Sequence, residues 1–477
     1  MATTQDNRLL AIYTPLGKDY LLLQKVAVTE SLSELFQIEV DLLHEEDEIG
    51  YQPTYIDPAA IIGKGVTVRI EQRDGTMREF SGIVNRFSQG SRNVRFSQYR
   101  ATIVPYVWIL TQKFQSRIYQ NISVPDILRD IFQGFEVRYE IQGVTNRRNY
   151  CVQYRESDFA FASRLMEEEG IYYYFEHSNG KHTIIFANTP QSHRDCPAKN
   201  RIPYITDVTN AEEDFISSIH GWQVGSQLQT GKVTLWDHHF QLPTRKLDDQ
   251  KNSVFNWGDN QKLELYDFPG GYARKYDEIS SAGAMQVSEL NLVNTDKQDA
   301  VKYAMEALDA QVIVCNGIGD CSAMTAGYRF ELFNHPLSSQ NGKYVITSVT
   351  HEAEQNPSYI SDEDLEKPYT NGFNCIAHGA GKPPFRPLRK TQKPIIQGGQ
   401  TAFVVGPAGE EIYTDKYGRV KVQFNWDRHG QVDSNSSCWL RVTQTWAGNN
   451  WGAISIPRIG MEVVVNFLEG DPDQPII

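Results

Sequence analysis

Acidic side chains form the pattern in this chain that comes nearest to a catalytic site. Glu167, Glu168 and Glu169 are consecutive, and a glycosidase needs two carboxylates roughly 5–9.5 Å apart across a sugar-sized cleft. Because Gly170 follows them and is typical of a helix end, a solvated helix face is the simpler interpretation. Three like charges near a helix C-terminus oppose the helix dipole, so a cationic partner is also compatible with this run.

The histidines do not form a metal-ligand pattern. His238 and His239 are adjacent, and neighbouring strand residues point to opposite faces, so they do not readily share one ion. The segment HEAEQ places Gln355 where the zinc-protease motif H-E-x-x-H needs its second histidine. The sequence also lacks a P-loop, G-x-G-x-x-G and G-x-S-x-G. We therefore expect no catalytic, cofactor-binding or metal-binding residues and no cofactor.

Aromatic residues form two further candidate sites. The run Ile171–Phe175 predicts a strand by propensity. Its tyrosines could stack on sugars or bases, but we favour tyrosines that alternate at a sheet or domain contact. Trp439, Trp446 and Trp451 lie near the C-terminus, where they suit either an interface hot spot or core packing. The residues alone leave both interpretations of the tryptophans open.

Three helices are expected to position these residues. The segment Ser123–Gly134 begins with an N-cap serine, has a proline in its first turn and ends in glycine. The segment Ser157–Gly170 also begins with a capping serine and ends in glycine. A third helix is expected to begin at Asp296, followed by apolar residues at i, i+3, i+4 and i+7.

Most of the remaining chain predicts strands. Val66, Val68 and Ile70 alternate with polar residues, and the segment Arg73–Thr76 predicts a tight hairpin turn. The segments GRVKVQFNWDR and MEVVVNFLEGD near the C-terminus repeat the alternation and predict a small closed barrel. The Pro-rich segment GKPPFRPLRKTQKP between these regions predicts an extended connector and a domain boundary.

Composition excludes several classes of protein. The 477 residues carry a formal net charge of −13 and no basic block with interleaved aromatics, so we expect no nucleic-acid partner. No apolar run is long enough for a membrane helix, and the N-terminus does not resemble a signal peptide. The six scattered cysteines suit free, buried thiols in a reducing compartment, although a Cys315–Cys321 disulfide is also conceivable.

The C-terminal motifs resemble the OB-fold base module of VgrG proteins, the spike proteins of the type VI secretion system. The match runs from Gly398 to Ile477 through DKYGRV, NWDR, WAG, PRIGMEV and EGDPD. Upstream, FSGIVNRFSQG, ESDFAFASRLMEEEG and LYDFPGGY resemble the family's first part, which is similar to phage baseplate hubs. The resemblance implies a mainly β fold with a few helices (α+β), with hub-like β-barrel subdomains followed by a C-terminal OB barrel.

On this basis we expect residues 1–375 to be the hub-like region, with two barrel subdomains and helical and β insertions. Residues 376–397 are expected to be a linker rich in Pro and Gly, and residues 398–477 the OB module. The chain stops at Pro475-Ile476-Ile477, where the family's β-helix begins, so we expect the β-helix to be absent.

The resemblance also implies a function and partners. The family implies a non-enzymatic homotrimer that joins an Hcp-type tube to a β-helix and PAAR tip and delivers effectors by contraction. Baseplate proteins are further expected partners, and the target membrane is contacted mechanically. Localisation is expected to be cytoplasmic before firing and then secreted without a cleaved signal peptide. Trp446, Trp451, Pro457 and Arg458 match the family's OB motif and are the predicted interface residues.

One alternative from another class is a peptidoglycan hydrolase on a phage-hub-like scaffold, suggested by the acidic run. Another is an OB module that binds single-stranded nucleic acid, which the negative charge opposes.

Overall fold

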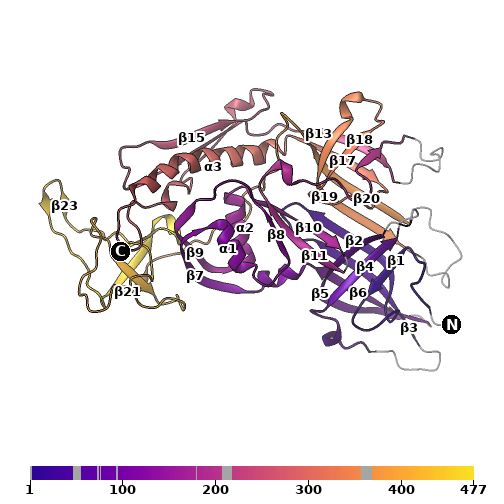
Figure 1. Cartoon of the computed structure of the whole chain (residues 1–477), viewed down its shortest axis with the longest axis horizontal. Coiled ribbons are helices and arrows are strands. Elements are labelled where there is room, and N and C mark those ends of the chain that lie inside the picture. Colours follow the sequence, from indigo (N-terminus) through magenta and orange to yellow (C-terminus); the bar gives the residue numbers. More distant parts are fainter. Residues whose placement is uncertain are drawn as a thin grey trace.

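The computed structural model describes residues 3–46, 55–71, 75, 77–92, 95–178, 180–206, 217–355 and 368–477. The predicted mainly β fold with a few helices is confirmed (Figure 1). A large sheet stands at one end of the molecule, two short helices and small sheets lie in the middle, and the C-terminal module lies at the other end.

One hydrogen-bonded sheet joins the N-terminal strands to strands from residues 201–377. The division into two barrel subdomains stays a prediction. In order across the sheet, its main path is β1 (Leu10–Tyr13), β4 (Gly65–Glu71), β5 (Met77–Arg92), β6 (Phe96–Val104), β3 (Gln37–Glu45), β2 (Leu22–Ser31), β19 (Gly342–Glu354), β20 (Tyr369–Ala377), β17 (Ile313–Gly319) and β13 (Ile219–Ser226). Beside this path, β12 (Arg201–Pro203) pairs with β18 (Arg329–Phe333), which pairs with β19.

The predicted alternation in the first hairpin is confirmed. Val66, Val68 and Ile70 are buried on β4, which pairs with β5 from Gly65 to Glu71. Apart from Gly75, the predicted turn Arg73–Thr76 lies outside the described residues.

Both predicted helix starts in the middle region are confirmed. Helices α1 (Val124–Ile131) and α2 (Asp158–Glu168) are capped by serine hydroxyls that accept backbone N–H bonds, at Ser123 and Ser157. The helices lie beside the strand pair β7 (Phe114–Ser123) and β9 (Arg147–Ser157). A second small sheet in this region consists of β8 (Val137–Glu140), β10 (Tyr172–Ser178) and β11 (Lys181–Ala187).

The tyrosine run forms β10, and its side chains are shared between two cores. Tyr173 and Phe175 pack into the core under the N-terminal strands, whereas Tyr172 and Tyr174 pack into the core under β17–β20. All four are buried. The interpretation as an alternating strand at a contact between two packed units is therefore confirmed.

The predicted start of the third helix was wrong. Helix α3 spans Leu292–Asp309 and begins four residues before Asp296. Asp296 does not cap the helix, because its carboxylate accepts hydrogen bonds from Asn146 and Tyr276. The turn before it continues the helix because Val293 is buried. Helix α3 packs on the sheet formed by β14 (Lys232–Asp237), β15 (Leu247–Asn252) and β16 (Glu264–Asp267).

The C-terminal module is a small β unit reached through residues 378–399, which contain neither helix nor strand. Its sheet has the order β22 (Lys421–Phe424), β21 (Gln400–Val405), β25 (Glu462–Phe467) and β26 (Pro475–Ile476). The domain limits 1–375, 376–397 and 398–477 stay predictions.

The C-terminal strands depart from simple alternation of buried and exposed residues at two points. Lys421 and Gln423 are buried and not solvent-facing, because β22 is covered on both faces. Lys421 Nζ donates to Ser434 O at 2.6 Å, and burial lowers the pKa of Lys421 to about 8. Met461 precedes β25 and is exposed.

The cysteines agree with the sequence prediction. All six thiols are free, and all except Cys438 are buried. Among the described residues, no helix has both the length and the apolar character that crossing a bilayer requires.

Candidate subunit interface

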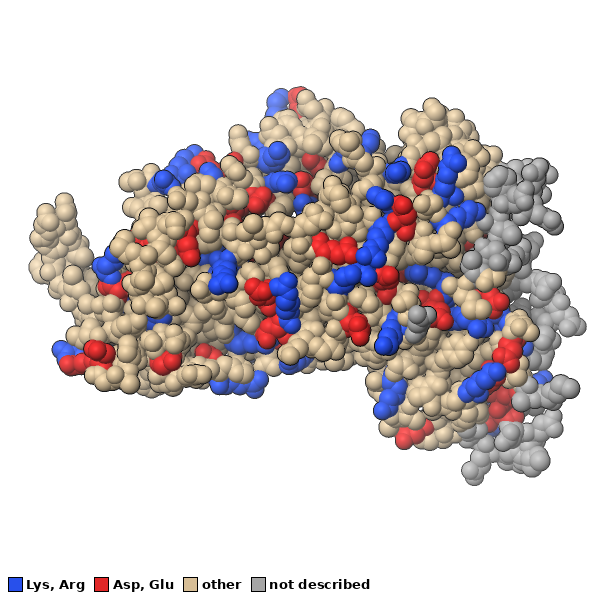
Figure 2. Space-filling model, in the orientation of Figure 1, with Lys and Arg blue, Asp and Glu red and all other residues tan. Residues whose placement is uncertain are grey.

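An uncharged hairpin projects from the C-terminal module and carries two of the predicted interface residues. Strands β23 (Ala447–Gly448) and β24 (Trp451–Gly452) form it, at the far left of Figure 1. Trp446 and Trp451 are 65% and 57% exposed, and their rings meet edge to face at 5.6 Å. No Asp, Glu, Lys or Arg occurs between Arg441 and Arg458. Figure 2 accordingly shows neither sign of charge on this projection.

The local sequence explains why this hairpin forms. Ala447 faces Gly452 and Gly448 faces Trp451, so Asn449 and Asn450 make a two-residue turn. Asn450 has φ +62°, which asparagine tolerates better than most residues. The Trp451 indole lies against Gly448, where a Cβ would come within 2.2 Å of the ring. Glycine at this position therefore lets one indole lie flat on the hairpin.

More apolar side chains are exposed near the hairpin. Ile454 is 80% exposed, and Met461, Val464 and Phe403 are also exposed. Val464 and Phe403 lie on the outer face of the paired strands β25 and β21. Their neighbours along each strand, such as Val465 and Ala402, point into the module core. Exposed apolar residues at this density are typical of a protein contact surface.

The other two predicted residues lie next to this surface. Arg458 is exposed and forms an ion pair with Glu411 of the same chain. Pro457 is half-buried beside it. Arg458 is thus held in place locally, with part of its guanidinium group still accessible.

Trp439 differs from the other two tryptophans. It is buried, and its indole Nε1 donates to Ser280 O at 2.9 Å. Ser280 belongs to the hub-like region, so Trp439 fastens the C-terminal module to that region. Core packing therefore describes Trp439, whereas an interface position remains the prediction for Trp446 and Trp451, the two exposed members of this group of three.

Ion pairs hold the same contact together. Arg419 is 2% exposed and donates to Asp277 at 2.5 and 3.0 Å and to Asp415 at 2.6 Å. Lys416 also reaches Glu278 at 2.5 Å. We call this contact between residues 277–280 and the C-terminal module the seam.

The connecting segment, residues 378–399, is bound both to the C-terminal module and to the hub-like region. Lys393 Nζ lies 2.7 Å from Asp471 and 2.6 Å from Asp473. Asp473 in turn accepts the backbone N–H of Val152 on β9 at 2.6 Å. Arg386 donates to the backbone oxygens of Gly170 and Asn188 at 2.9 and 2.6 Å.

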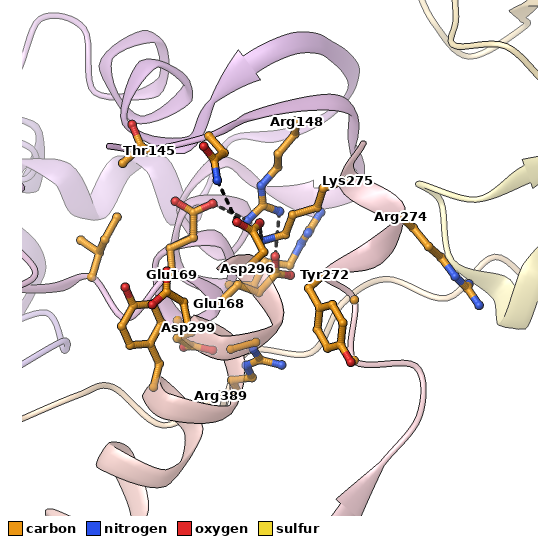
Figure 3. A pocket seen from close by; sticks show the side chains of 18 of the residues that line it. Thr145, Arg148, Glu168, Glu169, Tyr272, Arg274, Lys275, Asp296, Asp299 and Arg389 are labelled. Carbon is orange, nitrogen blue, oxygen red and sulfur yellow. Dashed lines mark hydrogen bonds and ion pairs between the residues drawn. The ribbon is translucent and has the colours of Figure 1, made fainter. Parts of the chain in front are cut away.

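The acidic run holds this segment and is not a solvated face. Glu167 accepts the backbone N–H groups of Lys390 and Thr391 at 3.0 and 2.9 Å. Arg148 donates to Glu168 at 2.7 Å and to Glu169 at 2.9 Å (Figure 3). The simpler interpretation of the run was therefore wrong, whereas a cationic partner is present.

These contacts border a cavity of about 690 Å³ between β9, α2, α3 and the connecting segment (Figure 3). A glycosidase acid needs a raised pKa. Burial would raise the pKa of Glu168, but Arg148 and Lys393 outweigh it and hold the pKa below the ordinary value. Glu168 therefore lacks the raised pKa that a glycosidase acid needs, and its contacts are those of a structural junction.

The histidines do not gather around a metal in the described part of the chain. No group of three or more His, Cys, Asp or Glu is placed to hold an ion there. His239 is buried, and its ring atom Nε2 lies 3.0 Å from the backbone oxygen of Tyr276.

Sequence reasoning missed a buried polar cluster between the large sheet and β10. Glu30 on β2 lies 3.2 Å from His177 Nε2, 3.9 Å from His351 Nε2 and 3.4 Å from Arg78. His351 Nδ1 is 2.6 Å from the Tyr369 hydroxyl. Burial lowers the pKa of both histidines, whereas Arg78 and the histidines lower that of Glu30 against the effect of burial. No sequence signal links these positions, since they lie on five different strands.

Two family models match the chain. The phage tail baseplate hub (GPD) model matches residues 29–357, more than half of the sequence. The model of the type VI secretion system/phage-baseplate injector OB domain matches residues 409–477. Type VI secretion system spike protein VgrG1a of Pseudomonas aeruginosa is 37% identical over 99% of this chain and 69% of its own length.

The chain belongs to the VgrG family. Its hub match precedes its OB match along the chain. VgrG1b of P. aeruginosa is 37% identical over the whole chain, and this chain spans about 60% of its length. The actin cross-linking toxin VgrG1 of Vibrio cholerae is 34% identical over 87% of this chain, which covers 36% of that protein.

Solved structures share the fold. The E. coli c3393 protein, described as a type VI secretion component similar to the T4 bacteriophage tail proteins gp27 and gp5, has a TM-score of 0.60. It is 17% identical, and 98% of each chain is covered. The Francisella PdpA–VgrG complex (lidded) gives a TM-score of 0.56 at 9% identity, covering 93% of this chain and 65% of that chain.

Proposed function

We propose that three copies of this VgrG-family chain assemble into the hub and OB part of a type VI spike. The observation that carries this proposal is the exposed, uncharged hairpin with Trp446 and Trp451. A folded chain rarely leaves two indoles in water, and tryptophan is enriched at the centres of protein interfaces. Threefold closure would bury this surface against a neighbouring copy.

The tube and the tip are the proposed partners on the two sides of this trimer. The hub-like sheet would face an Hcp-type tube, and the OB modules would continue into a β-helix with a PAAR tip. Effectors would be delivered by contraction, with baseplate proteins as further partners and mechanical contact with the target membrane. Family membership supports this arrangement, since the relatives are spike proteins.

We also propose that this part of the protein works without catalysis, is made in the cytoplasm and leaves through the type VI system. Support comes from the acidic run, which is engaged in holding the connecting segment. A cell-wall lysis assay tests this: hydrolysis that disappears in Glu168→Gln would establish the hydrolase alternative.

The subunit interface is tested by native mass spectrometry at micromolar concentration. The double variant Trp446→Ala/Trp451→Ala should shift the protein from trimer toward monomer, because it removes the largest exposed apolar side chains of the hairpin. Trp236→Ala is the matched control, since Trp236 is also an exposed tryptophan but lies on β14. A wild-type chain that stays monomeric, or a double variant that stays trimeric, would contradict the proposed interface.

A further inference from the structure

Two cysteines face each other directly in the large sheet. In the antiparallel pair β17 and β20, Cys315 lies opposite Cys375. Facing residues in such a pair have Cα atoms about 4.5 or 5.5 Å apart. A disulfide requires Cα atoms roughly 4.4–6.8 Å apart, so either register fits without moving the backbone.

Both thiols point to the same side of the sheet. Cys315 and Cys375 are 3% and 0% exposed, whereas their neighbours Asn316 and Asn374 are exposed. The two thiols face each other across neighbouring strands within one buried core. The pair is therefore arranged for bonding in the reduced protein.

We propose that Cys315 and Cys375 are a redox site that closes to a disulfide when the protein meets a small-molecule disulfide such as oxidised glutathione. The Cys315 thiolate attacks one sulfur of the oxidant, forms a mixed disulfide and expels the first glutathione. The Cys375 sulfur then attacks Cys315 Sγ and expels the second. Two S–H bonds are lost, one S–S bond forms, and the oxidant takes both protons and both electrons as two thiols.

The environment assigns the two roles. The hydrogen bond from Cys375 lowers the pKa of Cys315 against the effect of burial, while burial and the same hydrogen bond raise the pKa of Cys375. Cys315 is also the thiol nearer the sheet edge, because β17 pairs with the last strand β13 whereas β20 lies between β17 and β19, so Cys315 is the first nucleophile.

Access runs through the edge of the sheet. Cys315 lies beside Val224 of β13, which is the last strand of the main path, and residues 223–226 of β13 are exposed. Local opening of this strand would admit an oxidant without unfolding the sheet.

The bond would tie together segments that are 60 residues apart in sequence (375 − 315). It would restrict the unfolded chain and raise the unfolding temperature of the protein. When this disulfide forms in the life of the protein rests on the proposed function. An exported spike leaves a reducing compartment for an oxidising one, where the bond would form.

The test uses the purified full chain, incubated with oxidised glutathione under native conditions. The remaining thiols are then alkylated in denaturant and mapped by peptide mass spectrometry. We expect four of the six cysteines to be labelled, with one linked peptide pair that contains Cys315 and Cys375. Six labelled cysteines, or a link between any other pair, would overturn the proposal.

Cysteine-to-alanine variants provide the control. Cys375→Ala should abolish the internal bond and leave at most a mixed disulfide on Cys315, whereas Cys321→Ala, from the same core, should keep it. Wild-type peptide mapping decides the question even where a variant does not fold. Native mass of the oxidised and reduced protein reports separately on trimer formation, so failure of the redox site and failure of the proposed function remain distinguishable.

Discussion

At the residue scale, this chain uses charge mainly to fix its own segments to one another. Arg148 binds two members of the acidic run, Arg386 binds two backbone oxygens, and Arg419 binds two aspartates. Buried arginines with several acceptors are costly to leave unpaired. Substitutions that remove one partner should therefore destabilise the protein far more than substitutions of exposed charges.

Arg419 gives the sharpest test of this view. Arg419→Met should destabilise the seam by about 3–5 kcal/mol, because it leaves Asp277 and Asp415 buried without a cation. Urea unfolding followed by tryptophan fluorescence and circular dichroism measures the effect. The double variant Arg419→Met/Asp277→Asn should recover part of the loss, since it also removes one stranded charge. An unchanged midpoint in the single variant would show that the seam does not depend on this pair.

Arg458 should behave differently, because it is exposed. Arg458→Ala is expected to leave the unfolding midpoint of the monomer nearly unchanged and to weaken the trimer. Subunit exchange between labelled and unlabelled protein measures trimer stability. Glu411→Ala is the control that removes the same ion pair but keeps the guanidinium group. Equal exchange rates for wild type and Arg458→Ala would show that Arg458 only binds Glu411.

At the element scale, the strand β10 separates two hydrophobic cores and contributes side chains to both. Its successive side chains enter different cores, so both depend on the same seven-residue strand. Its position explains a run of buried aromatics that resembles a binding platform in sequence. Aromatic residues bury a large area from a strand of this length, which suits a wall that must seal both sides.

Tyr173→Ala and Tyr174→Ala should each destabilise the protein by about 3–5 kcal/mol, because each leaves a cavity in one core. Tyr266→Ala is the control, since Tyr266 is 55% exposed on β16, and surface changes usually stay within about 0.5 kcal/mol. Chemical denaturation compares the three variants. A cost for only one of the two β10 tyrosines would contradict a shared wall.

Much of this architecture follows from local sequence, and the exceptions have physical causes. Serine caps, glycine stops and alternating apolar residues predicted α1, α2 and β4, because these signals act within a few residues. The start of α3 was misplaced because Asp296 resembles a cap but binds Asn146 and Tyr276 instead. Lys421 occupies a polar position of an alternating strand, yet it is buried and donates to Ser434 O, 13 residues further along the chain.

The candidate site was predictable only in part. The family motif located Trp446, Trp451, Pro457 and Arg458, but nothing in their types distinguishes an exposed indole from a buried one such as Trp439. The partners of the acidic run are Arg148 and backbone groups more than 200 residues away, at 390–391. The Glu30 cluster could not be found at all, because its members meet only once four strands of the large sheet have packed against β10 of a separate sheet.

At the scale of the whole molecule, buried histidines make stability depend on pH. Burial lowers the pKa of His182 to about 3 and of His193 to about 4, and it also lowers the pKa values of His177 and His351. Between about pH 6.5 and these values the unfolded chain binds protons that the folded chain does not. The stability associated with these groups is therefore full above about pH 6.5 and is lost as the pH falls.

The histidines should consequently lower the melting temperature from pH 7 to pH 4.5, against the raised carboxyl pKa values of Asp299 and Asp309, which act in the opposite direction. Each such histidine contributes up to about 1.4 kcal/mol per pH unit within its window. The lowered pKa of Glu30 acts in the same direction below about pH 4.5. Calorimetry across the range measures the slope, and His193→Gln should reduce it. A flat profile from pH 7 to pH 5 would contradict the buried neutral histidines.

The charged seam has a consequence for how such proteins diversify. Surfaces that meet through ions and hydrogen bonds remain wettable when they are parted, unlike the two halves of an apolar core. An OB module transplanted from a relative should thus yield a folded chimera as long as it supplies an arginine at the place of Arg419 to meet Asp277 of the hub-like region. Recombination at the seam would therefore combine a new OB module with an existing hub-like region, with no further change to either one.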